Sequence, residues 1–193
     1  PNVSMTVDIP AVIETGGLSN LTISLDAASG LPVTVNLAFS GDADIAGPNI
    51  DYSSSATSVS IPAGSTSAGV TIVASADTLD EANEDLDIDI SSVINGTELG
   101  VQQSTVTIVD DDNPPNITLS IDNLTISETG GVATVTATTD AESGQDITVN
   151  LSFSGTALAS DYTESASQIV ISAGDLTGTM TISADADALN EAL

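Results

Sequence analysis

The chain has 193 residues with 28 Asp and Glu and no Lys, Arg or His, so its formal net charge at pH 7 is −28. Because binding to nucleic acid phosphates and to anionic membranes depends on Lys and Arg, the composition argues against both partners. No Cys and no His means no disulfides, no thiolate zinc site and no imidazole ligand, which leaves only oxygen ligands of the kind that Ca²⁺ or Mg²⁺ prefers.

Alternation of apolar and polar residues dominates the first 112 residues and predicts an all-β fold. It predicts seven strands, at about 3–8, 18–25, 33–39, 57–61, 68–74, 86–94 and 104–109. Turn residues such as Gly16-Gly17 and Asn95-Gly96 separate them, and no helix is expected beyond a short turn around 79–84. Seven short strands in about 110 residues are typical of an immunoglobulin-like sandwich of two packed sheets.

An internal repeat organises the whole chain. Residues 1–14 (PNVSMTVDIPAVIE) align without gaps on 115–128 (PNITLSIDNLTISE), and 33–41 align on 147–155, an offset of 114. Four extra residues near 47–50 then reduce the offset to 110. The sequence therefore predicts tandem sandwiches: a repeat over 1–112, a Pro-rich linker at 113–115, and an incomplete repeat over 116–193 that lacks the last two strands.

Acidic residues of the first repeat concentrate in loops that should share one end of the sandwich. Because successive strands run in opposite directions, the loops after the first, third and fifth strands and the exit from the seventh meet there. These loops contain Glu14, Asp42, Asp44, Asp51, Asp77, Asp80, Glu81, Glu84, Asp85, Asp110, Asp111 and Asp112. Two carboxylates about 4 Å apart repel by roughly 4 kcal/mol at an effective dielectric constant near 20, so a cation or protons must enter. Calcium, which accepts six to eight oxygens from flexible loops, is the favoured cation.

Other interpretations of the acidic residues stay open. The simplest is a solvated surface, and Asp87 and Asp89 fit it because they alternate with apolar residues along a strand. An EF-hand loop starting at Asp42 is disfavoured, since its fifth position is Ala46 and no Glu occupies the twelfth. Six N-x-Ser/Thr triplets could accept glycans on a secreted protein, although abundant Ser and Thr explain most of them by chance.

Catalysis is not expected from this composition. Without His, Cys or Lys, a Ser or Thr nucleophile lacks an ordinary base, and only a carboxylate pair of the glycosidase type is conceivable. Four aromatic residues would offer little stacking surface for a sugar. The sequence predicts a protein that is not an enzyme.

Several motifs of the first repeat occur in one order: Glu14-x-Gly-Gly, VNLAFSG, Asp51-Tyr52, Asp77-x-x-x-Glu81-x-x-Glu84 and a closing VTIVDDD. Together they resemble a Calx-beta domain across the entire repeat. The resemblance implies a seven-stranded sandwich with calcium at one end. The ligands that it implies are Glu14, Asp51, Asp77, Glu81, Glu84, Asp110, Asp111 and Asp112, with Glu128, Asp161, Asp187 and Glu191 in the second repeat. The family often has another Asp just before the position of Asp77, where this chain has Ala76, so the number of ions stays open.

Three functions follow as hypotheses. The first is a calcium-binding structural repeat of an extracellular stalk, adhesin or filament, on the surface of a marine or halophilic bacterium, with calcium stiffening the sandwich ends and the junctions to neighbouring repeats. The second is a calcium-sensing regulatory domain pair. The third is a ligand-binding or self-assembling module whose second repeat is completed by strands from a neighbouring chain. No run of about 18 apolar residues is present, so membrane insertion is not expected, and any signal peptide would lie outside this segment.

Overall fold

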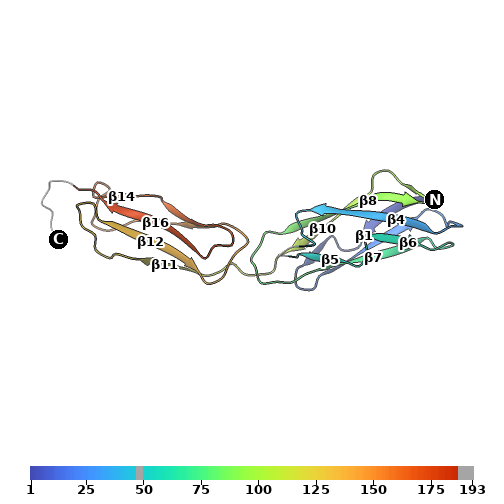
Figure 1. Ribbon diagram of the computed structural model, residues 1–193, viewed down its shortest axis with the longest axis horizontal. Helices are drawn as coiled ribbons and strands as arrows, with labels where there is room; N and C mark the ends of the chain where they lie inside the picture. The colour runs from blue at the N-terminus through green and yellow to red at the C-terminus, as the bar shows by residue number, and fades with distance from the viewer. Residues whose placement is uncertain (47–49, 187–193) are drawn as a thin grey trace. The chain divides into compact units, whose positions relative to one another are not determined.

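The computed structural model describes residues 1–46 and 50–186, in which all regular structure is β-strand (Figure 1). By their contacts the residues form two compact units, Pro1–Thr78 with Ala82–Asp111 and Leu79–Glu81 with Asp112–Leu193. Over the described ranges, no helix is long and apolar enough to cross a membrane. The predicted all-β fold of sandwich-like units is confirmed.

The first unit consists of two five-stranded sheets packed face to face (Figure 1). One sheet has the order β5-β7-β3-β1-β9 and the other β2-β10-β8-β4-β6. The strands are β1 (Asn2–Val7), β2 (Ala11–Ile13), β3 (Leu18–Leu25), β4 (Val33–Gly41), β5 (Tyr52–Ser54), β6 (Ser58–Ile61), β7 (Ser67–Ala74), β8 (Glu84–Ile94), β9 (Thr97–Glu98) and β10 (Gln103–Val109). All seven predicted strands are present, and β2, β5 and β9 are additional because two or three residues are too few to display a period.

The core of the first unit comes from every second residue of the long strands. Leu21 and Ile23 of β3 are fully buried, as are Leu86 and Ile88 of β8 on the facing sheet. Each such side chain contributes roughly 1.5 to 3 kcal/mol when it is removed from water. The alternation that predicted the strands therefore also identifies the residues that hold the two sheets together.

A change of sheet between β1 and β2 sets up the acidic end. Asp8 accepts hydrogen bonds from the amide and the side chain of Asn20, at 2.7 and 2.9 Å, and buried Ser19 donates to the carbonyl of Ile9 at 2.7 Å. The chain then joins the other sheet, where β2 pairs parallel with β10. This pairing places Glu14 directly beside the exit of β10.

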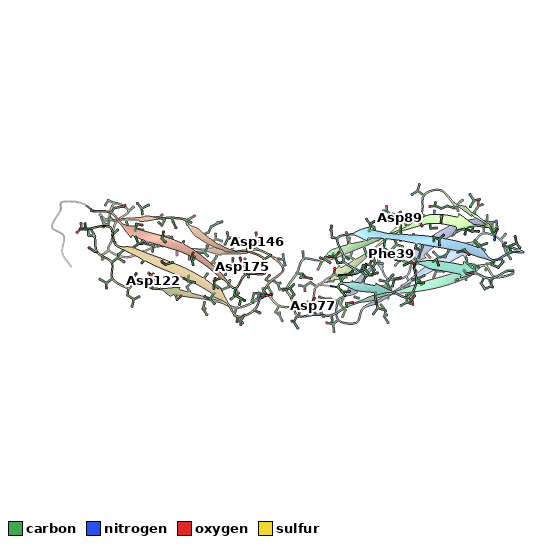
Figure 2. All side chains as sticks on the ribbon, in the orientation of Figure 1. Phe39, Asp77, Asp89, Asp122, Asp146 and Asp175 are labelled. Atoms are coloured by element: carbon green, nitrogen blue, oxygen red, sulfur yellow. The ribbon has the colours of Figure 1, made fainter. Side chains whose placement is uncertain are left out.

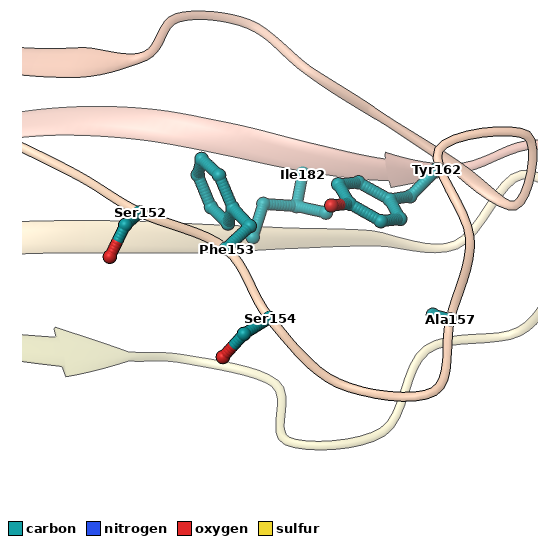
Figure 3. A pocket seen from close by; sticks show the side chains of 6 residues that line it. All are labelled: Ser152, Phe153, Ser154, Ala157, Tyr162 and Ile182. Carbon is teal, nitrogen blue, oxygen red and sulfur yellow. The ribbon is translucent and has the colours of Figure 1, made fainter.

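The second unit has a four-stranded sheet, β11-β12-β16-β14, and a two-stranded sheet, β13-β15. Its strands are β11 (Ile117–Ile121), β12 (Val132–Thr139), β13 (Ile147–Asn150), β14 (Tyr162–Glu164), β15 (Gln168–Ile171) and β16 (Thr177–Ala184). A small core of Ala137, Ile169, Ile171 and Met180 lies between the two sheets. The rings of Phe153 and Tyr162, whose centroids lie 6.2 Å apart, line a pocket of this unit together with Ile182 (Figure 3). Up to residue 186, the last one described, no strand of this unit corresponds to β8 or β10.

Candidate metal centre

Two groups of three carboxylates form among the loops of the first repeat. One comprises Glu14, Asp77 and Asp112, and the other comprises Asp51, Glu81 and Glu84. In each group, one oxygen from every residue lies within 4.8 Å of the others. Figure 2 shows Asp77 in the loops at one end of the first unit, whereas Asp89 lies along a sheet. Folding has gathered residues that are distant in sequence.

Glu14 is held in place at both its backbone and its side chain. Its amide donates to the carbonyl of Val109 at 2.9 Å, and its Oε1 accepts from the amide of Asp77 at 2.9 Å. The residue is only 6% exposed, while Asp77 is exposed and Asp112 half-buried. The group thus combines one fixed, buried carboxylate with two that solvent can reach.

Asp51 is the buried carboxylate of the second group, as Glu14 is of the first, and it is 7% exposed. Its Oδ2 accepts from the amide of Asp44, and its own amide donates to the carbonyl of Asp44 at 2.9 Å. The amide of Ser75 donates to the Asp51 carbonyl at 2.8 Å. These bonds fix the carboxylate beside Glu81 and Glu84, which are both half-buried.

The negative charges at this end of the first unit affect the phenol of Tyr52. Tyr52 is buried next to Asp51, and its pKa is raised above the ordinary value of 10.0. Burial is the largest cause, and the negative charges of Asp44 and Asp51 add to it. A positive ion at the Asp51 group would oppose the second cause.

Two members of the closing triple Asp lie outside both groups. The amide of Asp110 donates to Oδ1 of Asn83 at 3.2 Å, and Oγ1 of Thr15 donates to Oδ1 of Asp111 at 3.0 Å. Sequence reasoning did not identify Asn83 or Thr15 as part of this end. Their only sequence signal is that each lies in a predicted loop directly beside a predicted ligand, Asn83 beside Glu84 and Thr15 beside Glu14.

The second repeat presents its predicted ligands differently. Glu128 is exposed, and Asp161 is half-buried and accepts from the amide of Leu158 at 2.6 Å and from Oγ of Ser160 at 2.9 Å. The predicted ligands Asp187 and Glu191 lie outside the described residues. Two of the four residues can therefore be placed. Asp161 keeps the kind of hydrogen bonds that hold Asp51, since its amide donates to the carbonyl of Leu158 at 2.9 Å and its carbonyl accepts from the amide of Asp185 at 2.9 Å. Glu128, in contrast, is exposed where Glu14 is buried.

Acids on the outer face of β8 have other partners. Oγ1 of Thr107 donates to Asp85 at 2.7 Å, and Oγ1 of Thr105 donates to Asp87 at 2.5 Å, both across the β8–β10 pair. These acids lie along a strand rather than in the loops. Asp87 lies along the strand as predicted, whereas Asp85, predicted in the loop after the fifth strand, lies within β8.

The chemistry of the two groups suits a hard divalent cation. All their donors are carboxylate oxygens, and the sequence has no Lys, Arg or His to neutralise them. Charges up to 4.8 Å apart repel by roughly 3 to 4 kcal/mol per pair at an effective dielectric constant near 20. A bound dication would convert this repulsion into attraction.

Comparison with protein families gives a match to the Calx-beta domain over residues 2–112 and again over 110–192. The chain belongs to the Calx-beta domain family. The resemblance predicted from the motifs is therefore confirmed, as is the occurrence of two repeats. A comparison with curated proteins gave no significant match for this Calx-beta chain.

Among solved structures, similar ones include CBD12 from CALX1.2, with 18% identity and a TM-score of 0.48 over 96% of this chain and 76% of that chain. The calcium binding domain CBD12 of CALX1.1 has 19% identity and a TM-score of 0.48 over 95% and 76%. The apo form of the Calx CBD1 domain has 18% identity and a TM-score of 0.45 over 58% and 100%.

Proposed function

We propose that the first repeat of this Calx-beta chain binds two calcium ions, one at Glu14, Asp77 and Asp112 and one at Asp51, Glu81 and Glu84. The observation that carries the proposal is the close approach of three carboxylates in each group, in a chain without a cationic side chain. Protonation at neutral pH would need large upward pKa shifts in several acids at once, whereas a dication needs none.

Geometry favours calcium among the hard cations. Calcium binds oxygens at about 2.3 to 2.6 Å, so two oxygens on one ion are separated by at most about 5 Å. The spread of 4.8 Å within each group falls inside that limit. Further oxygens, including Asp110 and Asp111, would complete the six to eight that calcium accepts. Glu128, Asp161, Asp187 and Glu191 are the equivalent ligands that we propose for the second repeat.

We infer that the bound ions serve structure rather than catalysis, in an extracellular repeat on a bacterial surface. A net charge of −28 without Lys or Arg suits a salty, calcium-rich exterior better than a cytosol. Calcium would stiffen the loops at the end of the repeat, next to the linker that contains Pro114 and Pro115. A regulatory sensor is the second candidate, but domains of that kind usually carry both signs of charge.

Thermal melting of the full chain, with calcium and with a chelator, tests the proposal. Calcium at about 100 times its dissociation constant adds about 2.7 kcal/mol of stability for one site. Asp51→Asn and Glu14→Gln should each reduce the calcium-dependent rise in Tm. Asp89→Asn removes the same charge from the outer sheet face and should leave that rise intact. Equal melting temperatures in calcium and chelator would refute the proposal.

A further inference from the structure

The turn after β8 contains the single Asn-Gly pair of the chain. Eleven Asn residues occur in the sequence, and only Asn95 is followed by Gly. The other ten precede larger residues, whose side chains hinder a reaction between the Asn side chain and the next amide nitrogen. Because this turn lies at the opposite end of β8 from Glu84, it is separate from the loops that contain the proposed metal ligands.

The backbone conformation limits which residue fits at the first position of the pair. Asn95 has φ +62°, the one positive φ outside glycine among the residues described. Most L-residues are strained in this region, whereas Asn and Gly adopt it readily, and Asn-Gly is a favoured turn pair. The turn therefore favours Asn or Gly at position 95.

Packing limits the second position of the pair to a small residue. A Cβ at Gly96 would lie 3.1 Å from Cγ1 of Val93 and 3.2 Å from Cγ1 of Val33. It would also lie 3.2 Å from the carbonyl oxygen of Pro1. These separations are shorter than ordinary van der Waals contacts, so a side chain would have to displace its neighbours. Backbone conformation and packing together thus maintain the Asn-Gly pair.

One hydrogen bond holds the side chain of Asn95 among the residues described. Its Nδ2 donates to the carbonyl of Pro32 at 2.8 Å, which ties the turn to the residue before β4. A single bond of this kind opens transiently in the folded state, and the side chain can then rotate until Cγ approaches the amide nitrogen of Gly96. Because Gly has no side chain, nothing on residue 96 obstructs that approach.

We propose that Asn95 is a site of spontaneous deamidation. The amide nitrogen of Gly96 attacks Cγ of Asn95, a C–N bond forms to close a succinimide ring, and the Cγ–Nδ2 bond breaks. Nδ2 leaves as ammonia with the proton that the Gly96 amide loses. Water then opens the ring, either at Cγ, which gives aspartate, or at the backbone carbonyl carbon, which gives isoaspartate. This modification goes beyond the proposed calcium binding and needs only water as a co-reactant.

Either product removes the link between the turn and Pro32. A carboxylate at position 95 cannot donate to a carbonyl, and the chain has no Lys, Arg or His to neutralise the added charge. Isoaspartate also inserts one carbon into the backbone directly before Gly96, where little space is available. Strand β9 follows this turn and pairs with β1 through two residues alone. Deamidation should therefore loosen β9.

Incubation of the full chain in mildly alkaline buffer, followed by peptide mass spectrometry, tests the proposal. Asn123 is the internal control: it is exposed in a loop and its Nδ2 also donates to a backbone carbonyl, that of Val132 at 3.2 Å, but Leu124 follows it. Asn95 should convert on the order of tenfold or more faster than Asn123. In the converted protein, hydrogen exchange of residues 97–99 should be faster, and Asn95→Asp should reproduce part of that change.

Three results would overturn the proposal. They are equal rates at Asn95 and Asn123, conversion of neither residue, and an unchanged rate at Asn95 in the Gly96→Ala chain, where the added methyl group should slow the attack. Asn95→Gly suits the left-handed backbone but has no side-chain amide, so its turn should show no mass change. If Gly96→Ala fails to fold, the comparison of Asn95 with Asn123 in the unsubstituted chain still decides the question.

Discussion

The same loop glutamate has different surroundings in the two repeats. Glu14 is 6% exposed, with its amide bonded to the carbonyl of Val109 at the end of β10. Glu128 aligns with it and precedes the same Gly-Gly turn, yet it is exposed, and residues 122–131 contain no strand equivalent to β2. The difference shows that the acidic end is built by the closing strands of the sandwich and not by the local sequence of the loop.

The largest difference between the repeats should appear at matched core positions on the first strand. Met5→Ala should destabilise the first unit by about 2 to 5 kcal/mol, because the side chain is 7% exposed and a cavity replaces it. Leu119→Ala should cost the second unit about 1 kcal/mol or less, since half of its surface is already in water. In urea unfolding, a Tyr162→Phe chain follows the first unit through Tyr52, and a Tyr52→Phe chain follows the second unit through Tyr162. Equal costs of the two alanine substitutions would contradict the comparison.

A matched pair of glycines gives the next effect. Gly41 has φ +117° and a Cβ there would lie 2.0 Å from the carbonyl oxygen of Asp85, whereas a Cβ at Gly155 would meet nothing within 4 Å. Both positions have positive φ, so both alanine variants are strained. Gly41→Ala should cost roughly 1 to 3 kcal/mol more than Gly155→Ala in the same unfolding assay. A larger loss at Gly155 would show that the second unit is closed in solution.

Much of the fold could be predicted, because long strands carry their own signal. Alternation located the seven long strands within a few residues, since one face of each lies on a core. The pairing of β2 with β10 could not be predicted in this way, because the three residues of β2 show no period and β10 is nearly a hundred residues away.

Contacts between residues distant in sequence also limit the prediction of the site. Loop order predicted that acids converge at one end, but the division into two groups depends on hydrogen bonds such as that from Asp77 to Glu14. Which of these acids bind metal stays a prediction.

Calcium should also change the titration of Tyr52, the phenol next to Asp51 in the first repeat. Burial and the charges of Asp44 and Asp51 raise its pKa above 10.0, so its neutral form favours the folded state until pH rises through that pKa. Calcium at the Asp51 group would cancel part of the charge effect and lower the pKa. Ultraviolet titration of the Tyr162→Phe chain, which leaves Tyr52 as its single phenol, measures this shift. An unchanged or higher pKa with calcium would contradict the placement of the ion.

The smallest effect concerns a feature that the repeats share. Asp26 accepts from the amide and side chain of Asn2, at 2.8 and 2.7 Å, and Asp140 accepts from Asn116 in the same way, at 2.8 Å each. These bonds lower both pKa values below 3.8. The stabilisation is therefore present above pH 3.8 and is lost as pH falls through the lowered pKa. Asp26→Asn and Asp140→Asn should each slightly weaken their own unit at neutral pH and reduce its acid sensitivity, as followed by acid titration of circular dichroism. A change in acid sensitivity in only one of the two variants would show that Asp26 and Asp140 do not have equivalent roles.

Calorimetric titration of calcium into the full chain tests most directly whether closure of the first sandwich creates two metal sites. The number of ions bound should fall by one in Asp51→Asn and by one in Glu14→Gln, and should not change in Asp89→Asn. Equal numbers in all four proteins, or no heat of binding in the unsubstituted chain, would contradict the account.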